Sequence, residues 1–203
     1  MSTEHETKTV TEKITLQPIQ IGELTVQIKG LTPLLMNKVS DKVKAKLIGD
    51  QTGKTKKKEL RNPKEEVKQK IHLLPNGKTG FPSAGFIKGM QYVAEFMNLK
   101  RKDVTCISPM NEYVEINFKK QTTNESIARI GSFHTPQVTF RPEFHDWSTK
   151  LNLRFNASLI SPEQILNLLK LAGLQAGLGD WRPNKSGSHG QYTVDKLTII
   201  EGR

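Results

Sequence analysis

Six periodic stretches of the chain predict an α+β fold of the ferredoxin-like (RRM-like) type. They follow one another as strand, helix, strand, strand, helix, strand, which is the βαββαβ order of that fold. Polar and apolar residues alternate in the strands, and apolar residues recur at spacings of three and four in the helices. We therefore expect a single domain over residues 17–203, preceded by a flexible N-terminal tail at residues 1–16 that is rich in Thr, Glu and Lys.

The first strand and the first helix of this order lie before residue 98. Apolar residues alternate with polar ones across 19–35, so we expect a half-buried strand that ends near Gly30. The Asn-Gly pair at 76–77 predicts a tight turn between two short strands. Ser83 is the expected N-cap of a helix whose apolar residues recur at helical spacing as far as Met97.

The other strands and the second helix follow a basic connector. Alternating patterns predict strands at 113–118, 147–159 and 191–200. Before the last of them, Ser161 and Gln164 form a capping-box pattern with a proline between them, which predicts the start of a helix. The leucine-rich run that follows predicts that this helix is buried.

Two segments are expected to be insertions in this core. Residues 38–70 hold twelve Lys or Arg against five Asp or Glu, and they are predicted to be exposed and to become helical after Pro63. Such a run is usually a solvated surface, but its one-sided charge fits a phosphate-contacting arm equally well. Residues 119–147 interleave basic and aromatic side chains, among them Arg129 and Arg141, and predict either a projecting hairpin or a loop that packs through its aromatic residues.

A glycine-rich loop at 177–194 is the strongest candidate binding segment. It contains four glycines in fourteen residues: Gly177, Gly179, Gly187 and Gly190. Glycines free the backbone, and successive N–H groups in such loops can bind anions. Arg182 and Lys185 add charge suited to phosphate, while Trp181 and His189 offer flat faces on which a base could stack. The alternative is a surface loop whose glycines only turn the chain.

The 203-residue chain is strongly basic, with 31 Lys and Arg against 20 Asp and Glu, a formal net charge of +11 and a pI near 9.7. This balance favours a polyanionic partner, nucleic acid ahead of an anionic membrane surface. A single cysteine, Cys106, excludes an intramolecular disulfide and fits a reducing, cytoplasmic environment. No apolar run approaches the ~20 residues of a membrane span. For that reason we expect no membrane partner. No zinc, Walker or Ser-His-Asp signature is present, so we also expect no metal or other cofactor.

Three short motifs together carry a family resemblance. They are Gly-Leu-Thr-Pro-Leu-Leu at 30–35, Phe-Pro-Ser-Ala-Gly-Phe-Ile-Lys-Gly at 81–89, and the glycine-rich loop. On these motifs the chain resembles the RAMP superfamily of CRISPR systems, particularly the backbone subunits that assemble along guide RNA. The family's helix-opening run is typically Pro-Gly-Ser-Ser-Leu-Lys-Gly, whereas here it is one residue longer and its glycine is displaced. The family's loop, Gly-Gly-x-x-Ser-x-Gly-x-Gly, matches at Gly177, Gly179, Ser186, Gly187 and Gly190, with Trp181-Arg182-Pro183 added.

The resemblance implies a hand-like molecule bound to RNA. The ferredoxin-like core would be the palm and residues 38–70 a finger-like insertion. Residues 119–147 would hold a thumb-like hairpin that wedges between nucleotides and touches the next protomer. The sugar–phosphate backbone would run over the glycine-rich loop and the start of the first helix. The expected nucleic-acid-binding residues are Lys88, Trp181, Arg182, Lys185, Ser186, Gly187 and His189, followed by Arg129, Arg141 and the basic segment.

The leading hypothesis is a non-catalytic protein that binds single-stranded nucleic acid, RNA or DNA. It would oligomerise along the strand, as a homo-oligomeric filament or within a multi-subunit ribonucleoprotein. Its affinity would fall steeply with salt and depend little on base sequence, because phosphate contacts and stacking dominate.

Three alternatives stay open. The chain is also similar to small proteins of this type from phages, so it could be a free-standing single-stranded DNA-binding protein that acts in an infected bacterial cell. It could be a RAMP-type endoribonuclease, since some relatives cut RNA with an aspartate in the region where Asp41 lies. His134, His145, Asp146, Asp180 and His189 could then serve as acid and base, although none has a diagnostic spacing. Finally, the basic face could bind an acidic protein.

Overall fold

The computed structural model describes residues 19–39, 43–45, 48–49, 62–130 and 135–200, which form an α+β fold with mostly antiparallel sheets and few helices. The strands and helices in chain order are β1 (Ile21–Gly30), β2 (Leu34–Leu35), α2 (Pro63–Gln69), β3 (His72–Leu73), β4 (Thr79–Pro82), α3 (Ala84–Val93), β5 (Ile107–Pro109), β6 (Tyr113–Asn117), β7 (Lys120–Ile130), β8 (Thr135–His145), β9 (Ser148–Asn156), α4 (Pro162–Leu171) and β10 (Tyr192–Ile200). Short 3₁₀ helices (Ala94–Met97, Arg101–Cys106 and Pro183–Lys185) and a π-helical turn (Ala172–Ala176) lie between them.

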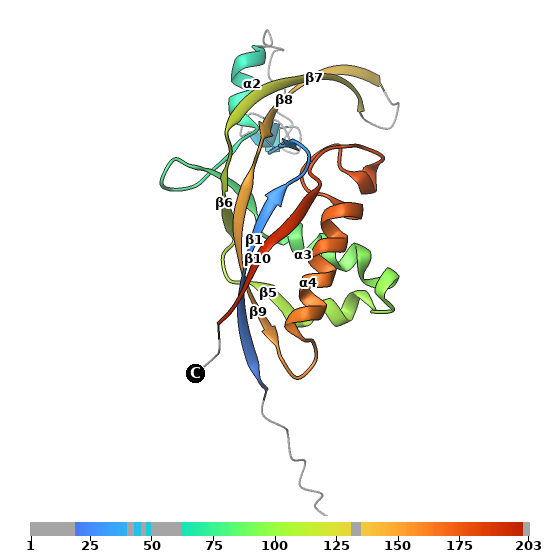
Figure 1. The fold of residues 1–203 in the computed structure, drawn as a ribbon. Coiled ribbons are helices and arrows are strands. Elements are labelled where there is room, and N and C mark those ends of the chain that lie inside the picture. The colour runs from blue at the N-terminus through green and yellow to red at the C-terminus, as the bar shows by residue number, and fades with distance from the viewer. Residues whose placement is uncertain (1–18, 40–42, 46–47, 50–61, 131–134, 201–203) are drawn as a thin grey trace, which may run out of the picture.

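A seven-stranded sheet forms the larger layer of the molecule (Figure 1). Its strands follow the order β10-β1-β9-β6-β4-β3, and β5 also pairs with β9. β1 pairs with β10 on one side and with β9 on the other, both antiparallel. β5 and β6 pair with different parts of β9, at residues 153–155 and 148–149, so together they act as one interrupted strand.

One face of this sheet packs against α3 and α4, which lie on the same side of it in Figure 1. Leu24, Val26 and Ile28 of β1 are buried there, whereas Gln27 and Lys29 are exposed, as the alternating pattern predicts. The helical side therefore holds the hydrophobic core, and the opposite face of β1 is polar. Among the described residues, no helix has both the length and the apolar composition needed to cross a bilayer.

The two core helices begin where the sequence predicts, but they are capped differently. Ser161 and Gln164 form the predicted capping box: the Gln164 N–H donates to Ser161 Oγ at 3.3 Å, and the Ser161 N–H donates to Gln164 Oε1 at 2.9 Å. Ser83 occupies the N-cap position of α3, but its hydroxyl is buried and makes no capping bond. α3 ends at Val93, and a 3₁₀ turn replaces the continuous helix expected as far as Met97.

The two predicted insertions meet at one end of the molecule. Residues 119–147 contain a hairpin in which β7 and β8 pair without a register shift, and β2 adds a third strand to it. α2, from the basic insertion, packs against β8, and Lys70 Nζ donates to the Phe140 carbonyl at 2.8 Å. Figure 1 shows α2 beside this hairpin beyond the end of the large sheet. The predicted tail at 1–16 and about half of the basic insertion, at 40–42, 46–47 and 50–61, lie outside the described residues.

Candidate nucleic-acid interface

The glycine-rich loop is anchored to the segment that follows β1. The Gly190 N–H donates to the Pro33 carbonyl, and the Asp180 N–H donates to the Leu35 carbonyl, each at 2.8 Å. These bonds bring the 30–35 motif and the loop together, although about three quarters of the chain separates them in sequence. The loop therefore has a fixed place at the end of β1.

Two glycines of this loop are required by both conformation and packing. Gly179 and Gly190 have φ angles of +73° and +71°, which side-chain-bearing residues rarely adopt. A Cβ on Gly190 would collide with the Leu178 carbonyl oxygen, and a Cβ on Gly179 would collide with the Leu35 carbonyl oxygen. The glycines therefore let the loop fold closely upon itself and upon β2.

A cavity of about 240 Å³ lies where the loop meets the start of α3. Lys88 of α3 and Arg182 of the loop both line it. The rest of the lining consists of Asn184, four glycines (Gly85, Gly89, Gly177 and Gly179) and three apolar residues (Phe81, Ala176 and Leu178). The cavity is smaller than the roughly 300–1,000 Å³ of sites that enclose a small molecule, so it suits one part of an extended chain better.

The two cations of this cavity are held differently. Arg182 Nη1 donates to the Gly179 carbonyl at 2.8 Å, which fixes the guanidinium and leaves further N–H groups to meet a ligand. Lys88 is exposed, and within the described part of the chain its ammonium makes no hydrogen bond or ion pair. Two positive groups from different elements thus face a space bordered by glycine, where an anion can approach the backbone closely.

Trp181, next to Arg182 in the chain, stacks on His189. Their ring centroids are 5.2 Å apart and their planes differ by 11°. The His189 side chain is only 13% exposed, and its Nε2 lies 3.0 Å from Glu143 Oε1. Trp181 itself is 44% exposed. His189 therefore supports the indole from within, and Trp181 is the ring that remains accessible for stacking.

Two polar side-chain contacts join the loop to the β7–β8 hairpin. Glu143 of β8 lies against His189, and its other carboxylate oxygen accepts a hydrogen bond from Thr122 Oγ1 at 3.0 Å. Arg141 Nε lies 3.0 Å from Asp180 Oδ2, an ion pair without hydrogen-bond geometry, and the Arg141 side chain is only 11% exposed. Arg141 thus holds the hairpin to the loop.

The remaining predicted binding residues lie around this loop and hairpin. Lys185 and Ser186 are exposed at the end of the 3₁₀ turn, and Ser186 takes a φ of +58°. A Cβ on Gly187 would collide with the Trp181 carbonyl oxygen. The backbone of Arg129 belongs to β7, in the half of that strand next to the hairpin end. The loop residues are therefore grouped together, and Arg129 belongs to the hairpin.

Among the residues considered as acid and base, His145 and His189 both lie near Glu143, with His145 Nε2 3.6 Å from Glu143 Oε2. Asp180 is paired with Arg141 instead. Asp146 is exposed and pairs with Lys119 at 3.8 Å. Asp41 and His134 lie outside the described residues. In the described ranges, no three His, Cys, Asp or Glu side chains are grouped so that they could hold a metal ion.

Sequence analysis did not identify three residues that contribute to this region. Asn37 Nδ2 donates to Asp180 Oδ2 at 3.1 Å across 143 positions of sequence. Asn184 lines the cavity, and its buried Oδ1 has no partner among the described atoms. Glu143 is the shared neighbour of two histidines. No local pattern encodes such contacts, because each one depends on how distant segments are brought together.

Comparisons with known proteins agree with this fold. No protein-family model and no curated protein sequence matches the chain. Among solved structures, the cryo-EM structure of the type III-B Cmr-beta bound to cognate target RNA contains a chain that matches with a TM-score of 0.56 and 13% identity. The protein shares the fold of the matched part of that Cmr-beta chain. The match covers 89% of this chain and 61% of the Cmr-beta chain, so the protein spans about three fifths of its length.

A crystal structure of Cmr6 from Pyrococcus furiosus also matches, with a TM-score of 0.44 and 11% identity, over 88% of this chain and 100% of Cmr6. The fold shared with the Cmr-beta chain agrees with the resemblance drawn from the three sequence motifs.

Proposed function

We propose that the protein is a non-catalytic binder of single-stranded RNA that assembles in several copies along the strand. The observation that carries the proposal is the cavity between α3 and the glycine-rich loop. Lys88 and Arg182 converge on it from two motifs that are far apart in sequence. The Cmr-beta chain of the same fold comes from a structure bound to cognate target RNA, which favours RNA over DNA as the ligand.

In this proposal the phosphates occupy the cavity and a base stacks on Trp181. Arg182 can donate two parallel hydrogen bonds to a phosphate, and Lys88 supplies a mobile point charge. The exposed face of Trp181 accepts any base, because every base has a flat π surface. Binding would therefore depend on salt and strand character far more than on sequence. The β7–β8 hairpin, tied to the same loop, would contact the next copy.

We also propose that the palm of this molecule is a ferredoxin-like core. It would consist of β1, α3, the interrupted strand β5–β6, β9, α4 and β10. In support, these elements occur in the βαββαβ order, and β1 and β9 are neighbours flanked by β10 and β6. Both helices pack on one face of the sheet. The β3–β4 pair and the β7–β8 hairpin would then be additions to it.

The test measures salt-dependent binding of a variant that lacks both cations of the cavity. Lys88→Gln combined with Arg182→Gln keeps polar side chains and removes two charges. We expect weaker binding to unstructured single-stranded RNA of any sequence. The slope of log affinity against log salt should flatten by roughly one to two units. The reason is that binding to a single strand releases about 0.7 counterions per phosphate contact, and the variant lacks two such contacts. Fluorescence anisotropy over a salt series gives both quantities.

A matched control removes the same charge from another surface. Lys150 and Lys196 are exposed on the polar face of the sheet, each opposite Gln27 of β1. Lys150→Gln combined with Lys196→Gln should leave the slope close to that of the wild type. An equal loss in both double variants would mean that binding reflects net charge alone. No affinity of the wild type for RNA would contradict the proposed function, and strong preference for single-stranded DNA would favour the phage-type alternative.

A further inference from the structure

A second exposed aromatic group lies at the far end of α3, away from the glycine-rich loop. Tyr92 is 39% exposed and Phe96 is 66% exposed. Their ring centroids are 6.4 Å apart and their planes are tilted by 60°, so the rings touch without covering each other. A single exposed apolar side chain is ordinary, whereas exposed apolar groups that lie together on a surface are candidates for an interaction site.

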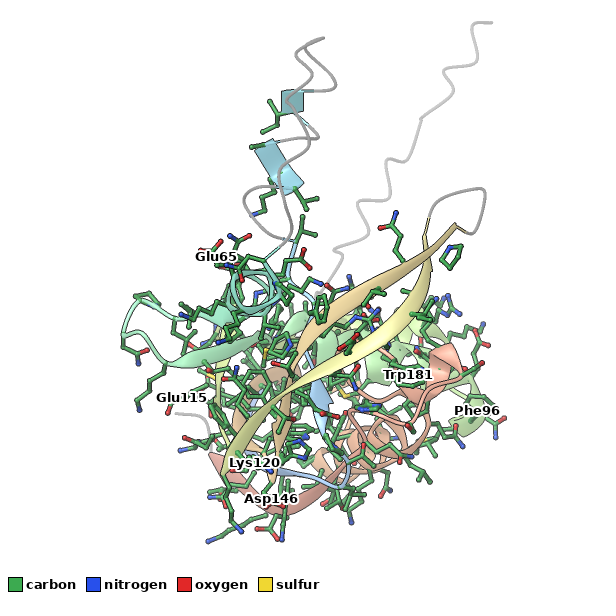
Figure 2. All side chains as sticks on the ribbon, turned by 90° about the horizontal axis from the view of Figure 1, so that it is seen from above. Glu65, Phe96, Glu115, Lys120, Asp146 and Trp181 are labelled. Carbon is green, nitrogen blue, oxygen red and sulfur yellow. The ribbon has the colours of Figure 1, made fainter. Side chains whose placement is uncertain are left out.

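Tyr92 and Phe96 follow Lys88 along one side of α3 and of the turn after it. Lys88 and Tyr92 are four residues apart on α3 and therefore share one face of the helix. Phe96 follows four residues later, in the 3₁₀ turn that extends α3. One exposed surface thus leads from the cavity, where Lys88 lies, to the two rings. Figure 2 places Phe96 and Trp181 on the same side of the molecule, far from Glu115 and Lys120.

Positive charge borders the rings. Lys100, Arg101 and Lys102 are consecutive and exposed. Arg101 Nε lies 3.5 Å from Glu95 Oε1, which places the guanidinium beside the turn that carries Phe96. This ion pair is open to solvent and therefore weak, so a phosphate could replace the carboxylate as the partner of Arg101. The Asp103 carboxylate already has a partner, because it accepts a hydrogen bond from the Lys100 N–H.

The chemistry of this surface favours a nucleic acid over a protein. Aromatic faces beside lysine and arginine are the combination that holds single strands, with the bases stacked and the backbone neutralised. A protein interface of standard size buries about 800 Å² on each side, and its centre is depleted of charged residues. Two rings bordered by exposed Glu95, Lys100 and Arg101 do not provide such a centre.

We propose that Tyr92 and Phe96 form a second stacking site for unpaired bases of the same RNA strand whose phosphates occupy the cavity at Lys88 and Arg182. This inference rests on the proposed function. It extends the path of the strand from the glycine-rich loop along α3 to the basic turn at residues 100–102. The site would take bases of any identity, because the rings offer faces and no base-specific donor pattern.

The experiment compares the wild type with Tyr92→Leu combined with Phe96→Leu. Leucine keeps an apolar side chain of similar bulk but cannot stack on a base. We expect the affinity for a uridine oligomer of about 16 nucleotides, the upper range of single-strand sites, to fall roughly 10-fold or more. Affinity for an oligomer of about 4 nucleotides should change little, because so short a strand need not span both sites. The salt slope should stay unchanged, since no phosphate contact is lost.

Leu159→Ala is the matched control, because Leu159 is another exposed apolar residue that lies in the turn between β9 and α4. Its affinity for both oligomers should equal that of the wild type. Cross-linking gives a readout that does not depend on a variant: RNA that carries 4-thiouridine should cross-link to the wild-type peptide containing Tyr92 and Phe96.

Each outcome has a distinct meaning. If the wild type binds RNA, the leucine variant binds it equally well and no cross-link maps to α3, this inference fails and the proposed function stands. If the variant keeps its RNA affinity but its copies no longer associate, the rings are a protein contact and the inference also fails. If the wild type binds neither RNA nor single-stranded DNA, the proposed function and the inference fail together.

Discussion

At the scale of single residues, His72 has the most clearly perturbed surroundings of the described histidines. Its ring lies 6.3 Å from that of Phe81 and 5.7 Å from that of Tyr113. Burial, and then the positive charges of Lys38 and Lys44, lower the pKa of His72. The folded protein therefore prefers the neutral imidazole, which connects the protonation of this side chain to the stability of the sheet edge at β3.

The sign of the pH effect follows from this lowered pKa. The unfolded chain keeps an ordinary value near 6.5, so below that pH it binds a proton that the folded state resists. The stability contributed by neutral His72 is complete above pH 6.5 and is lost as the pH falls toward the folded value. We predict that His72→Phe loses less stability than the wild type between pH 7 and about pH 5, measured by urea unfolding. Parallel pH profiles for the two proteins would contradict the assignment.

For single side chains, the sequence could predict some features and not others. Trp181 and Arg182 were predicted as binding residues from residue type and from their place in a glycine-rich loop, and their contact with a ligand stays a prediction. The sequence could not predict that His189 is covered by Trp181 and paired with Glu143, or that Arg141 is buried against Asp180. The Ser83 hydroxyl was expected to cap α3 and does not, because Ser83 itself has helical backbone angles.

At the scale of elements, the glycine-rich loop depends on close backbone approach. Gly190→Ala would introduce a Cβ in a left-handed conformation and press it against the Leu178 carbonyl oxygen. Gly77 has a similar φ of +78°, but a Cβ there meets no atom within 4 Å. Gly77→Ala is therefore a control that carries only the conformational cost, about 1–2 kcal/mol. We predict that Gly190→Ala lowers the free energy of unfolding by more than Gly77→Ala and also weakens RNA binding. Equal effects of the two substitutions on stability would show that the loop can move aside.

Elements with a clear period were predicted well, and irregular ones were not. β1, β9, β10 and α4 all lie within their predicted ranges. Burial of one face requires apolar residues at a period of two in a strand and 3.6 in a helix, and these periods can be recognised in the sequence. The division of one strand into β5 and β6, and the 3₁₀ turn at the end of α3, depend on neighbours and leave no such period. The hairpin at 119–147 was located from its composition, while its long unshifted register was not predictable.

At the scale of the whole molecule, the prediction concerns what accompanies the protein from the cell. A chain of 22.9 kDa that binds RNA in several copies should elute from size exclusion as a much larger particle with a high ratio of absorbance at 260 to 280 nm when purified at low salt. RNase treatment should reduce both the size and the ratio, and DNase should change neither. A clean monomer with no affinity for added oligonucleotide would instead point to an acidic protein partner.

The contacts between the loop and the hairpin limit how such a protein can be rebuilt or diversified. A hairpin taken from another protein would arrive without Glu143 and Arg141, so His189 would lose its carboxylate and Asp180 its guanidinium in the recipient. Trp181 would then rest on an unsupported ring. The hairpin is therefore not a module that can be exchanged alone: a working chimera must carry hairpin and loop as a matched pair, and natural variation at these four positions is expected to be correlated.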